Sequence, residues 1–316
     1  MKKKLLTHIT PLMLLVICLL IMGFLSIKTQ SFFSMKNVVN ILEANSYRLI
    51  LAVGMMLIIS SGAIDLSVGS IVSVSAIFMA KALKAELPVP ACISIGLLTG
   101  AFLGAINGAA IHYSRINPFI ITLATSYMYR GLSLIITGGI PITKLPQAFR
   151  TFGCGDILGM ESGVTMAVVI ALMIVPLFYY MRWGSYLRSM GGNPQALHRT
   201  GVKVSRYRIS SYMLMGIFAA VVGIIITARL NSAEPNAGMN MEMDAICAVI
   251  MGGTSLHGGD GSLLGTVIAV FLMGLIRNGL TIMSISPYYQ QFITGAILLI
   301  AVVIAEIRSR RSRMDG

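Results

Sequence analysis

The chain has 316 residues, of which 56% are hydrophobic and only 11% are charged. This composition excludes a soluble globular protein and predicts one transmembrane domain over residues 1–316. The net charge of +13 does not indicate nucleic-acid binding, because the basic residues lie beside apolar segments, as the positive-inside rule describes.

The N-terminus places Lys2, Lys3 and Lys4 ahead of an apolar run, which is typical of either a signal peptide or a first membrane span. The run from Pro11 to Ile27 is longer than the apolar part of a usual signal peptide, and no small-residue cleavage site follows it. We therefore expect an uncleaved first span.

Apolar blocks follow one another along the chain, and a membrane-spanning helix needs about 20 such residues. Two blocks, 47–62 and 244–255, are short for a span and are expected to be tilted, broken or extended by flanking residues. The sequence thus predicts an all-α polytopic membrane protein with about ten transmembrane helices, some short or broken. The blocks are 9–27, 47–62, 66–84, 90–111, 117–137, 163–181, 211–229, 244–255, 263–280 and 288–307.

Three basic clusters set the expected orientation: the N-terminal lysines, the interval 183–210 and the arginines between 308 and 313. Even numbers of blocks separate them, so all three, including both termini, are expected in the cytoplasm. The opposite side holds more acidic residues, and its segments are either solvated loops or a docking surface for an external protein. Those segments are 28–46, 85–89, 138–162, 230–243 and 281–287.

The fourth block contains Gly96, Gly100, Gly104 and Gly108, each four residues after the last. On a helix these glycines form a smooth strip that lets a neighbouring backbone approach closely, so we expect helix packing there. Asn107 lies beside the strip, and a buried amide in a membrane needs a polar partner or a water-lined cavity.

Five ionisable residues lie in or beside apolar segments, where a charge at the bilayer centre costs about 2.5 kcal/mol or more. Each is expected to be paired, interfacial or beside a cavity. Asp65 can instead cap the helix that follows it through backbone N–H groups. The five are Arg48, Asp65, Arg130, Asp244 and Arg277.

The interval from Trp183 to Ser210 is basic and contains the signals of one short helix. Asn193 can cap it, Pro194 suits its first position, and Gly201 can adopt the left-handed conformation just past its end. A helix of about two turns is marginal on its own. The interval is therefore either a basic loop at the lipid surface or a docking helix for a cytosolic partner.

The chain lacks motifs typical of an enzyme. Its glycine-rich stretch, Met251–Thr266, has no Gly-Lys-Ser/Thr ending to bind a nucleotide phosphate, and it predicts a tight, non-helical turn between two membrane segments. The four cysteines and four histidines are scattered, so we expect no disulfide framework, no metal site and no catalytic residue.

Five segments in the same order resemble the permease subunits of bacterial ABC (ATP-binding-cassette) sugar importers of the ribose, xylose and galactose type. The resemblance covers residues 35–307. The segments are SSGAIDLSVGS (60–70), GAINGAAIHYSRINPFIITLATSYMYRG (104–131), MGGNPQALHRTGVKVSRYRI (190–209), DAICAVIMGGTSLHGGDGSLLGT (244–266) and YYQQFITGAILLIAVV (288–303).

This resemblance implies a multi-pass protein of the bacterial inner membrane that works with an ABC ATPase, a periplasmic or lipid-anchored sugar-binding protein and a second permease subunit, identical or paralogous. The segment after Met190 resembles the family's coupling helix, which docks on the ATPase. ATP and Mg then belong to the ATPase, and this chain needs no cofactor. The implied coupling residues are Gly191, Gly192, Asn193, Pro194, Ala196, Arg199 and Gly201.

The sequence departs from the family pattern at Ala63, Leu197, His198 and Asp260.

A passing sugar needs hydrogen-bonding groups, and polar residues in the apolar blocks are candidates for the translocation path. The alternative role for these residues is hydrogen bonding between helices. The candidates are Asp65, Asn107, Asn117, Thr122 and Arg130.

Two other classes of protein compete with a permease driven by a separate ATPase. A self-contained secondary transporter or channel would need a series of acids at matched depths, which the blocks do not show. A membrane-embedded enzyme would need several acids in one loop, and 138–162 contains only Asp156 and Glu161.

Overall fold

The computed structural model describes residues 2–153, 155–157 and 160–314, most of which are helical. Each of the ten apolar blocks forms a helix, or a helix that continues into a π-helical turn. The helices are α1 (Lys2–Lys28), α2 (Met35–Ser60), α3 (Val68–Lys84), α4 (Val89–Ser114), α5 (Pro118–Thr137), α6 (Gln147–Gly153), α7 (Ser162–Val175) with the π-helix η1 (Pro176–Tyr180), α8 (Arg182–Gly192), α9 (Pro194–Arg199), α10 (Val204–Leu230), α11 (Met241–Met251), α12 (Leu263–Ile282) and α13 (Pro287–Met314).

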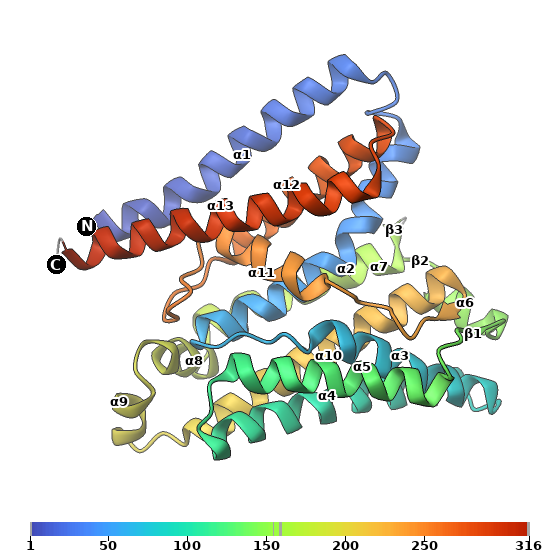
Figure 1. Cartoon of the computed structure of the whole chain (residues 1–316), viewed down its shortest axis with the longest axis horizontal. Coiled ribbons are helices and arrows are strands. Elements are labelled where there is room, and N and C mark those ends of the chain that lie inside the picture. The colour runs from blue at the N-terminus through green and yellow to red at the C-terminus, as the bar shows by residue number, and fades with distance from the viewer. Residues whose placement is uncertain (1, 154, 158–159, 315–316) are drawn as a thin grey trace.

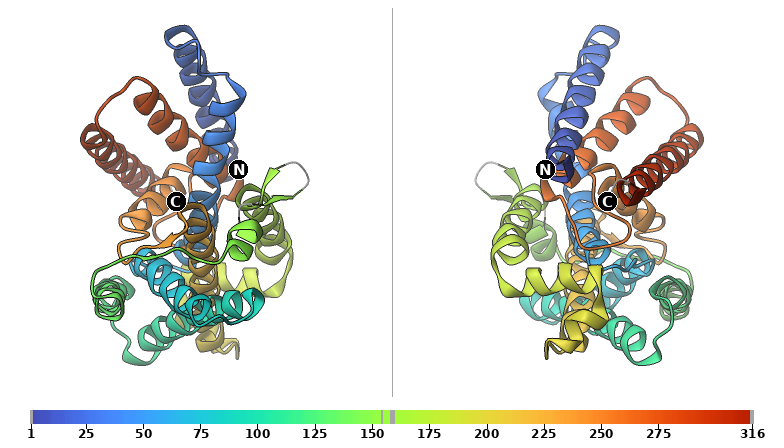
Figure 2. Two further views of the ribbon diagram at one scale, coloured as in Figure 1. Left: turned by 90° about the vertical axis from the view of Figure 1, so that its right-hand side faces the viewer. Right: turned by 90° about the vertical axis from the view of Figure 1, so that its left-hand side faces the viewer.

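The helices pack on two sides of α2 (Figure 1). On one side α1 runs along α12, and α11 packs against α2, α12 and α13. On the other side α10 packs against α3 and α4, while α5 covers α3. Figure 2, which views the molecule along its long axis, shows the blue α1 and the red C-terminal helices on one side of α2 and the cyan and green helices on the other.

The core of the molecule runs along α2 and α3. Every residue from Ile50 to Ser60 is buried, and so is every residue from Val68 to Ile77. A helix that is apolar on all faces is stable when other helices surround it. The second block extends to Met35 because Ser34 caps the helix, accepting the Asn37 N–H at 3.3 Å. Block 47–62, which is short for a membrane span, is therefore extended by flanking residues.

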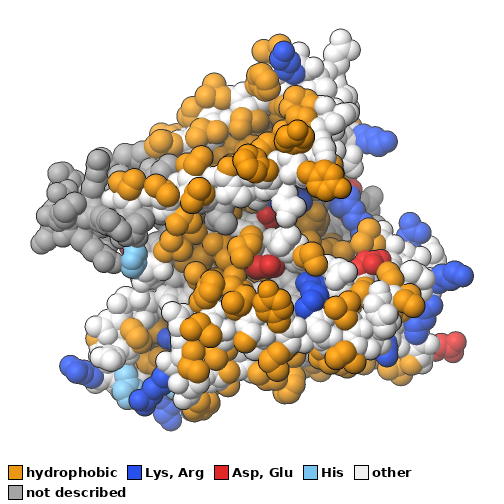
Figure 3. Space-filling model, in the orientation of Figure 1, with side chains coloured by type: hydrophobic (Ala, Val, Ile, Leu, Met, Phe, Trp, Pro, Cys, Tyr) orange, Lys and Arg blue, Asp and Glu red, His pale blue; other side chains and the backbone are white. Residues whose placement is uncertain are grey.

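The outward faces of the peripheral helices are apolar. Leu20 is 68% exposed, Phe102 65% and Ile135 80%. Figure 3 shows hydrophobic side chains over both helical layers, with Lys and Arg gathered near the two ends of the molecule. In water such faces would be unstable, so they indicate contact with lipid.

Seven helices in the described part of the chain are long and apolar enough to cross a membrane. α3 (17 residues) and α11 (11 residues) are shorter, and the apolar part of α13 is Pro287–Val303. The polytopic, all-α fold is confirmed, whereas the number of ten transmembrane helices is not.

The glycine strip of α4 packs as predicted. A β-carbon at Gly100 would collide with the Gly216 carbonyl oxygen, and one at Gly108 would lie 2.8 Å from Cα of Ile209, both on α10. Gly104 meets the Tyr212 carbonyl of the same helix, while Gly96 faces Met79 of α3. The strip thus lets α4 and α10 touch backbone to backbone.

Both termini and α9 lie at one end of the molecule, and α6 lies at the other (Figure 1). This second end also holds two small antiparallel sheets. β1 (Ile142–Thr143) pairs with β4 (Ser232–Ala233), and β2 (Asp156–Ile157) pairs with β3 (Met160–Glu161). The arrangement agrees with the predicted grouping of the basic clusters on one side. Cys154 lies outside the described residues.

Candidate coupling segment and translocation path

The interval 183–210, predicted as a loop with one short helix, contains two helices and the start of a third. α8 ends at Gly192, α9 covers Pro194–Arg199, and α10 begins at Val204. α8 forms because Gly184, Leu187 and Met190 recur at helical spacing and are buried. Arg182 and Arg188 conceal this pattern in the sequence.

The predicted start and stop signals of α9 are confirmed. Asn193 has an extended backbone, and its Oδ1 accepts the Ala196 N–H at 2.9 Å. Pro194 is the first residue of the helix, and Gly201 has a φ of +82° just beyond its end. Leu197 is buried, whereas Ala196 and Arg199 are exposed. The short helix is therefore largely exposed, and Leu197 is its one buried residue.

α8 ties this projecting helix to the membrane helices. The Trp183 indole N–H donates to Ser210 Oγ at 2.9 Å, and the rings of Tyr186 and Tyr207 meet edge to face at 5.1 Å. Both contacts join α8 to α10. α8, which leads into α9, is thus held on α10 by side chains in direct contact.

Three glycine segments that are far apart in sequence meet beneath the coupling segment. A β-carbon at Gly191 would collide with the Ser60 carbonyl oxygen and lie 2.7 Å from the Gly259 nitrogen. A β-carbon at Gly258 would lie 2.8 Å from both Gly191 Cα and Gly62 N. The Gly259 N–H also donates to Ser60 O at 2.9 Å. We call this contact the glycine junction; it joins the segments 60–62, 191–192 and 258–261.

The glycine junction distinguishes two of the predicted coupling residues, Gly191 and Gly192. Gly191 is half-buried, and the side where a β-carbon would lie is filled by Ser60 O and Gly259 N, so it contributes to the support of the segment. Gly192 is exposed, and a β-carbon there would meet nothing within 4 Å. The glycine-rich turn predicted for residues 251–266 is the third part of this junction and is non-helical from Gly252 to Ser262.

Asp65 begins a chain of buried polar side chains. Its Oδ1 accepts the Ser67 N–H at 2.9 Å and the Ser67 hydroxyl at 2.6 Å. Asn107 donates to Ser67 Oγ at 2.7 Å, and the Tyr129 hydroxyl donates to Asn107 Oδ1 at 3.0 Å. Asp65, Ser67 and Asn107 have no exposed area. Asp65 Oδ2 has no hydrogen-bond partner within the described residues, which leaves one acceptor free in the middle of the bundle.

Thr122 lies against the same turn. Its hydroxyl donates to the Pro118 carbonyl of its own helix at 2.9 Å and lies 3.3 Å from the Ile64 carbonyl, to which the Tyr212 hydroxyl donates at 3.2 Å. The structure thus brings together Asp65 from the turn before α3, Asn107 from α4 and Thr122 from α5. In this conformation their hydrogen bonds join helices, and the cluster is closed to solvent.

The other two candidates for the path lie elsewhere. Asn117 caps α5, with its Oδ1 accepting the Phe119 N–H at 3.0 Å. Arg130 donates to the carbonyls of Pro235 and Ala237 at 2.7 and 2.9 Å, and so fixes the segment that precedes α11. In this structure Asn117 thus acts within its own helix end, whereas Arg130 joins α5 to a distant segment.

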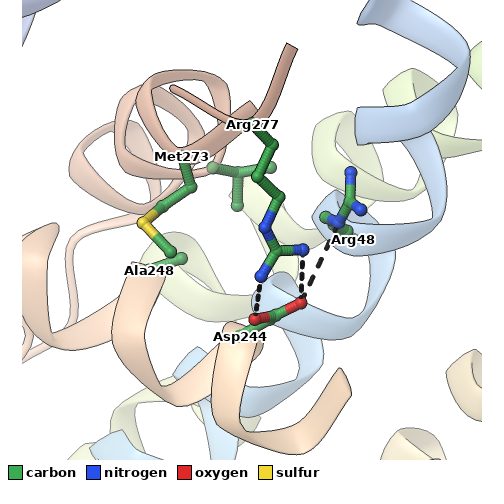
Figure 4. A pocket seen from close by; sticks show the side chains of 6 residues that line it. Arg48, Asp244, Ala248, Met273 and Arg277 are labelled. Atoms are coloured by element: carbon green, nitrogen blue, oxygen red, sulfur yellow. Dashed lines mark hydrogen bonds and ion pairs between the residues drawn. The ribbon is translucent and has the colours of Figure 1, made fainter. Parts of the chain in front are cut away.

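The remaining charges of the apolar segments pair with one another (Figure 4). Arg277 forms a two-pronged ion pair with Asp244, with Nη1 at 2.7 Å from Oδ2 and Nη2 bonded to Oδ1. Arg48 Nε lies 4.0 Å from Asp244 Oδ2. A cavity of about 10 Å³ beside them has room for about one water molecule. The pairing expected for these charges is confirmed, although the sequence did not show which residues pair.

The apolar outer faces and closed polar interior define a multi-pass membrane protein. A family model described as "Branched-chain amino acid transport system / permease component" matches residues 37–302, and the chain belongs to this family. No solved structure matches the chain.

Curated relatives match over nearly their whole length. The ribose import permease of Escherichia coli (strain K12) is 35% identical over 294 residues, covering 92% of each chain. That of Bacillus subtilis (strain 168) is 38% identical over 287 residues, covering 90% of this chain and 89% of its own. The galactose/methyl galactoside import permease of Escherichia coli (strain K12) is 33% identical over 331 residues, covering 99% and 98%. The resemblance predicted from the five segments is confirmed.

Proposed function

We propose that this chain is the permease subunit of an ABC importer, which moves a monosaccharide or a similar small polar solute into the cytoplasm. ATP hydrolysis, with its Mg, takes place on a separate ATPase, and an extracytoplasmic binding protein, periplasmic or lipid-anchored, delivers the solute. A second permease subunit, identical or paralogous, completes the path in the bacterial inner membrane. The names of the relatives, which import ribose and galactose, support a sugar as the solute.

The observation that carries the proposal is that the capped helix α9 is exposed and follows α8, which side-chain contacts hold against α10. The end of the molecule that holds α9 also holds both termini, and we assign this end to the cytoplasm because its flanking segments are basic. Exposed residues such as Ala196 offer a surface to the ATPase, while the glycine junction connects that surface to the membrane helices.

The polar cluster around Asp65 supports a path through this side of the bundle. Its free acceptor and its hydroxyl and amide groups match the hydrogen-bonding needs of a sugar. The hydroxyl and amide groups bond to one another when the path is closed, and they become available when α3, α4 and α5 separate.

The variant Ala196→Glu tests the role of α9. Ala196 is exposed, so the folded permease tolerates the larger side chain, while a buried unpaired carboxylate in the interface with the ATPase costs about 1–3 kcal/mol or more. We expect loss of sugar uptake, of ATPase co-purification and of ATP hydrolysis stimulated by the binding protein. Ala196→Ser, which keeps a small uncharged side chain, is the matched control and should transport normally.

Two results would contradict the proposal. Full uptake by Ala196→Glu at normal membrane abundance would remove the coupling role of α9. Uptake by cells that carry the unaltered permease but lack every ABC ATPase gene next to it would instead favour the self-contained transporter.

A further inference from the structure

A basic groove lies between the turn joining α4 to α5 and the start of α10, with α9 as one wall. The groove has a volume of about 920 Å³, which is within the range of sites that take whole small ligands, about 300–1,000 Å³. Its walls come from segments about 80 residues apart in the sequence. The positively charged or histidine side chains that line it are His112, Arg115, His198, Arg199 and Arg208.

The groove carries positive charge without compensation. Its lining contains no acidic residue, and no ion pair in the described part of the chain involves Arg115, Arg199 or Arg208. The charges of Arg208, Arg115 and His198 are close enough to act on His112. Figure 3 shows Lys, Arg and His side chains gathered at the lower left, the corner of the molecule where α9 lies in Figure 1. Like charges held together in this way favour an anionic ligand.

The groove also lies at the ends of membrane helices. His112 is in the last turn of α4, Pro118 begins α5, and Val204 begins α10, and all three of these helices are long and apolar enough to span a membrane. These positions place the groove at the depth of the lipid headgroups. Tyr113, 74% exposed, lines it as well, and tyrosine is enriched at membrane–water interfaces.

Apolar surface continues from the groove toward the bilayer. Ile116 in the groove is 45% exposed, and Phe119 and Ile120 in the first turn of α5 are 46% and 57% exposed. A soluble anion would use only the basic part of this surface. A ligand with an anionic head and apolar chains would use both parts.

We propose that the basic groove binds the headgroup of an anionic phospholipid, with its phosphate among the arginines and its acyl chains along the start of α5. Basic pockets between membrane helices bind such headgroups in other proteins. The bound lipid would bridge the α4–α5 turn and α9, so it would hold the coupling segment in place from the membrane side. This inference goes beyond the proposed function, because it concerns a ligand that is not transported.

The test uses the full-length permease purified in detergent, with lipid binding counted by native mass spectrometry. Dioleoyl-phosphatidylglycerol is the anionic probe and dioleoyl-phosphatidylcholine the neutral one. The variant Arg115→Gln/Arg208→Gln removes two charges from the groove. The control Lys203→Gln/Arg206→Gln removes two charges from exposed neighbours that do not line it.

We expect phosphatidylglycerol to bind the wild type in preference to phosphatidylcholine. Each cation at a lipid surface contributes roughly fivefold in affinity, so the groove variant should bind phosphatidylglycerol about 30-fold more weakly. The control variant should bind nearly as the wild type does. Arg115→Lys/Arg208→Lys keeps both charges and should retain binding, which separates the loss of charge from misfolding.

Four outcomes would overturn the proposal. The first is equal loss of binding in the groove and control variants, and the second is equal binding of the two lipids. The third is unchanged phosphatidylglycerol binding by the groove variant together with loss of ATPase co-purification, which would assign the groove to an acidic segment of a partner protein. Complete displacement of the lipid by millimolar glycerol phosphate would likewise assign it to a soluble anion.

Discussion

Gly191 and Gly192, at the end of α8, allow a test of the glycine junction in which the two substitutions differ only in the packing around the added β-carbon. Both have helical backbones, and neither has a positive φ. A β-carbon at Gly191 would collide with Ser60 O and lie 2.7 Å from Gly259 N, whereas one at Gly192 would meet nothing within 4 Å. We therefore expect Gly191→Ala and Gly192→Ala to have opposite effects.

The sizes of the two effects follow from these contacts. Gly191→Ala overpacks the junction against backbone, which cannot rotate away, and overpacking costs typically about 1–3 kcal/mol. Gly192→Ala fills open space in a helix and should gain about 0.5–1 kcal/mol. The two variants should thus differ in stability by about 1.5–4 kcal/mol, since the terms have opposite signs.

Thermal unfolding of the detergent-solubilised permease measures the stability difference, and sugar uptake in cells measures its consequence. Gly191→Ala should melt below the wild type and transport poorly, because α8 is pushed away from α2 and from the loop before α12. Gly192→Ala should melt at or above the wild type. If both variants melt together, the glycine junction does not hold the coupling segment and the reasoning fails.

Two further predictions concern the closed path and the orientation. Asn107→Ala removes the link between Ser67 and Tyr129, and leaving buried polar partners unpaired costs about 1–3 kcal/mol; uptake should fall while ATPase co-purification stays normal, and normal uptake would exclude Asn107 from the path. Single cysteines at Ser185 and Ser286, in a variant lacking the native cysteines, should differ in labelling by a membrane-impermeant maleimide added to spheroplasts, with only position 286 reacting. Labelling of position 185 before lysis would reverse the proposed orientation.

Local signals predicted some features well. The Asn-Pro start of α9 and its glycine stop act within a few residues, so the sequence alone specifies the helix ends. The strip of glycines in α4 also indicates close helix packing by itself. The structure adds that the main partner helix is α10. The apolar blocks also predicted the helices, because a long run of apolar residues in a membrane protein forms few structures other than a membrane helix.

Features that depend on distant partners were not predictable. Arg48, Asp244 and Arg277 each called for a partner, but they lie on α2, α11 and α12, and only the packing of these helices shows that they meet. The glycine junction combines three motifs that look independent along the chain. α8 was missed for a different reason, because its basic residues hide an amphipathic pattern that becomes evident once Leu187 and Met190 are seen to be buried.

The ion cluster of Figure 4 has a consequence for biosynthesis. α2 enters the membrane early and carries Arg48, but Asp244 is made 196 residues later and Arg277 is made 229 residues later. α11 has 11 residues, roughly 16 Å of helix, so it is too short to be inserted as an independent span. It must instead be drawn in against helices already in place, and Arg48 remains without its counter-charge until then. α11 and α12 therefore complete the charge pairing of Arg48 on α2, so that a helix made earlier depends on helices made later.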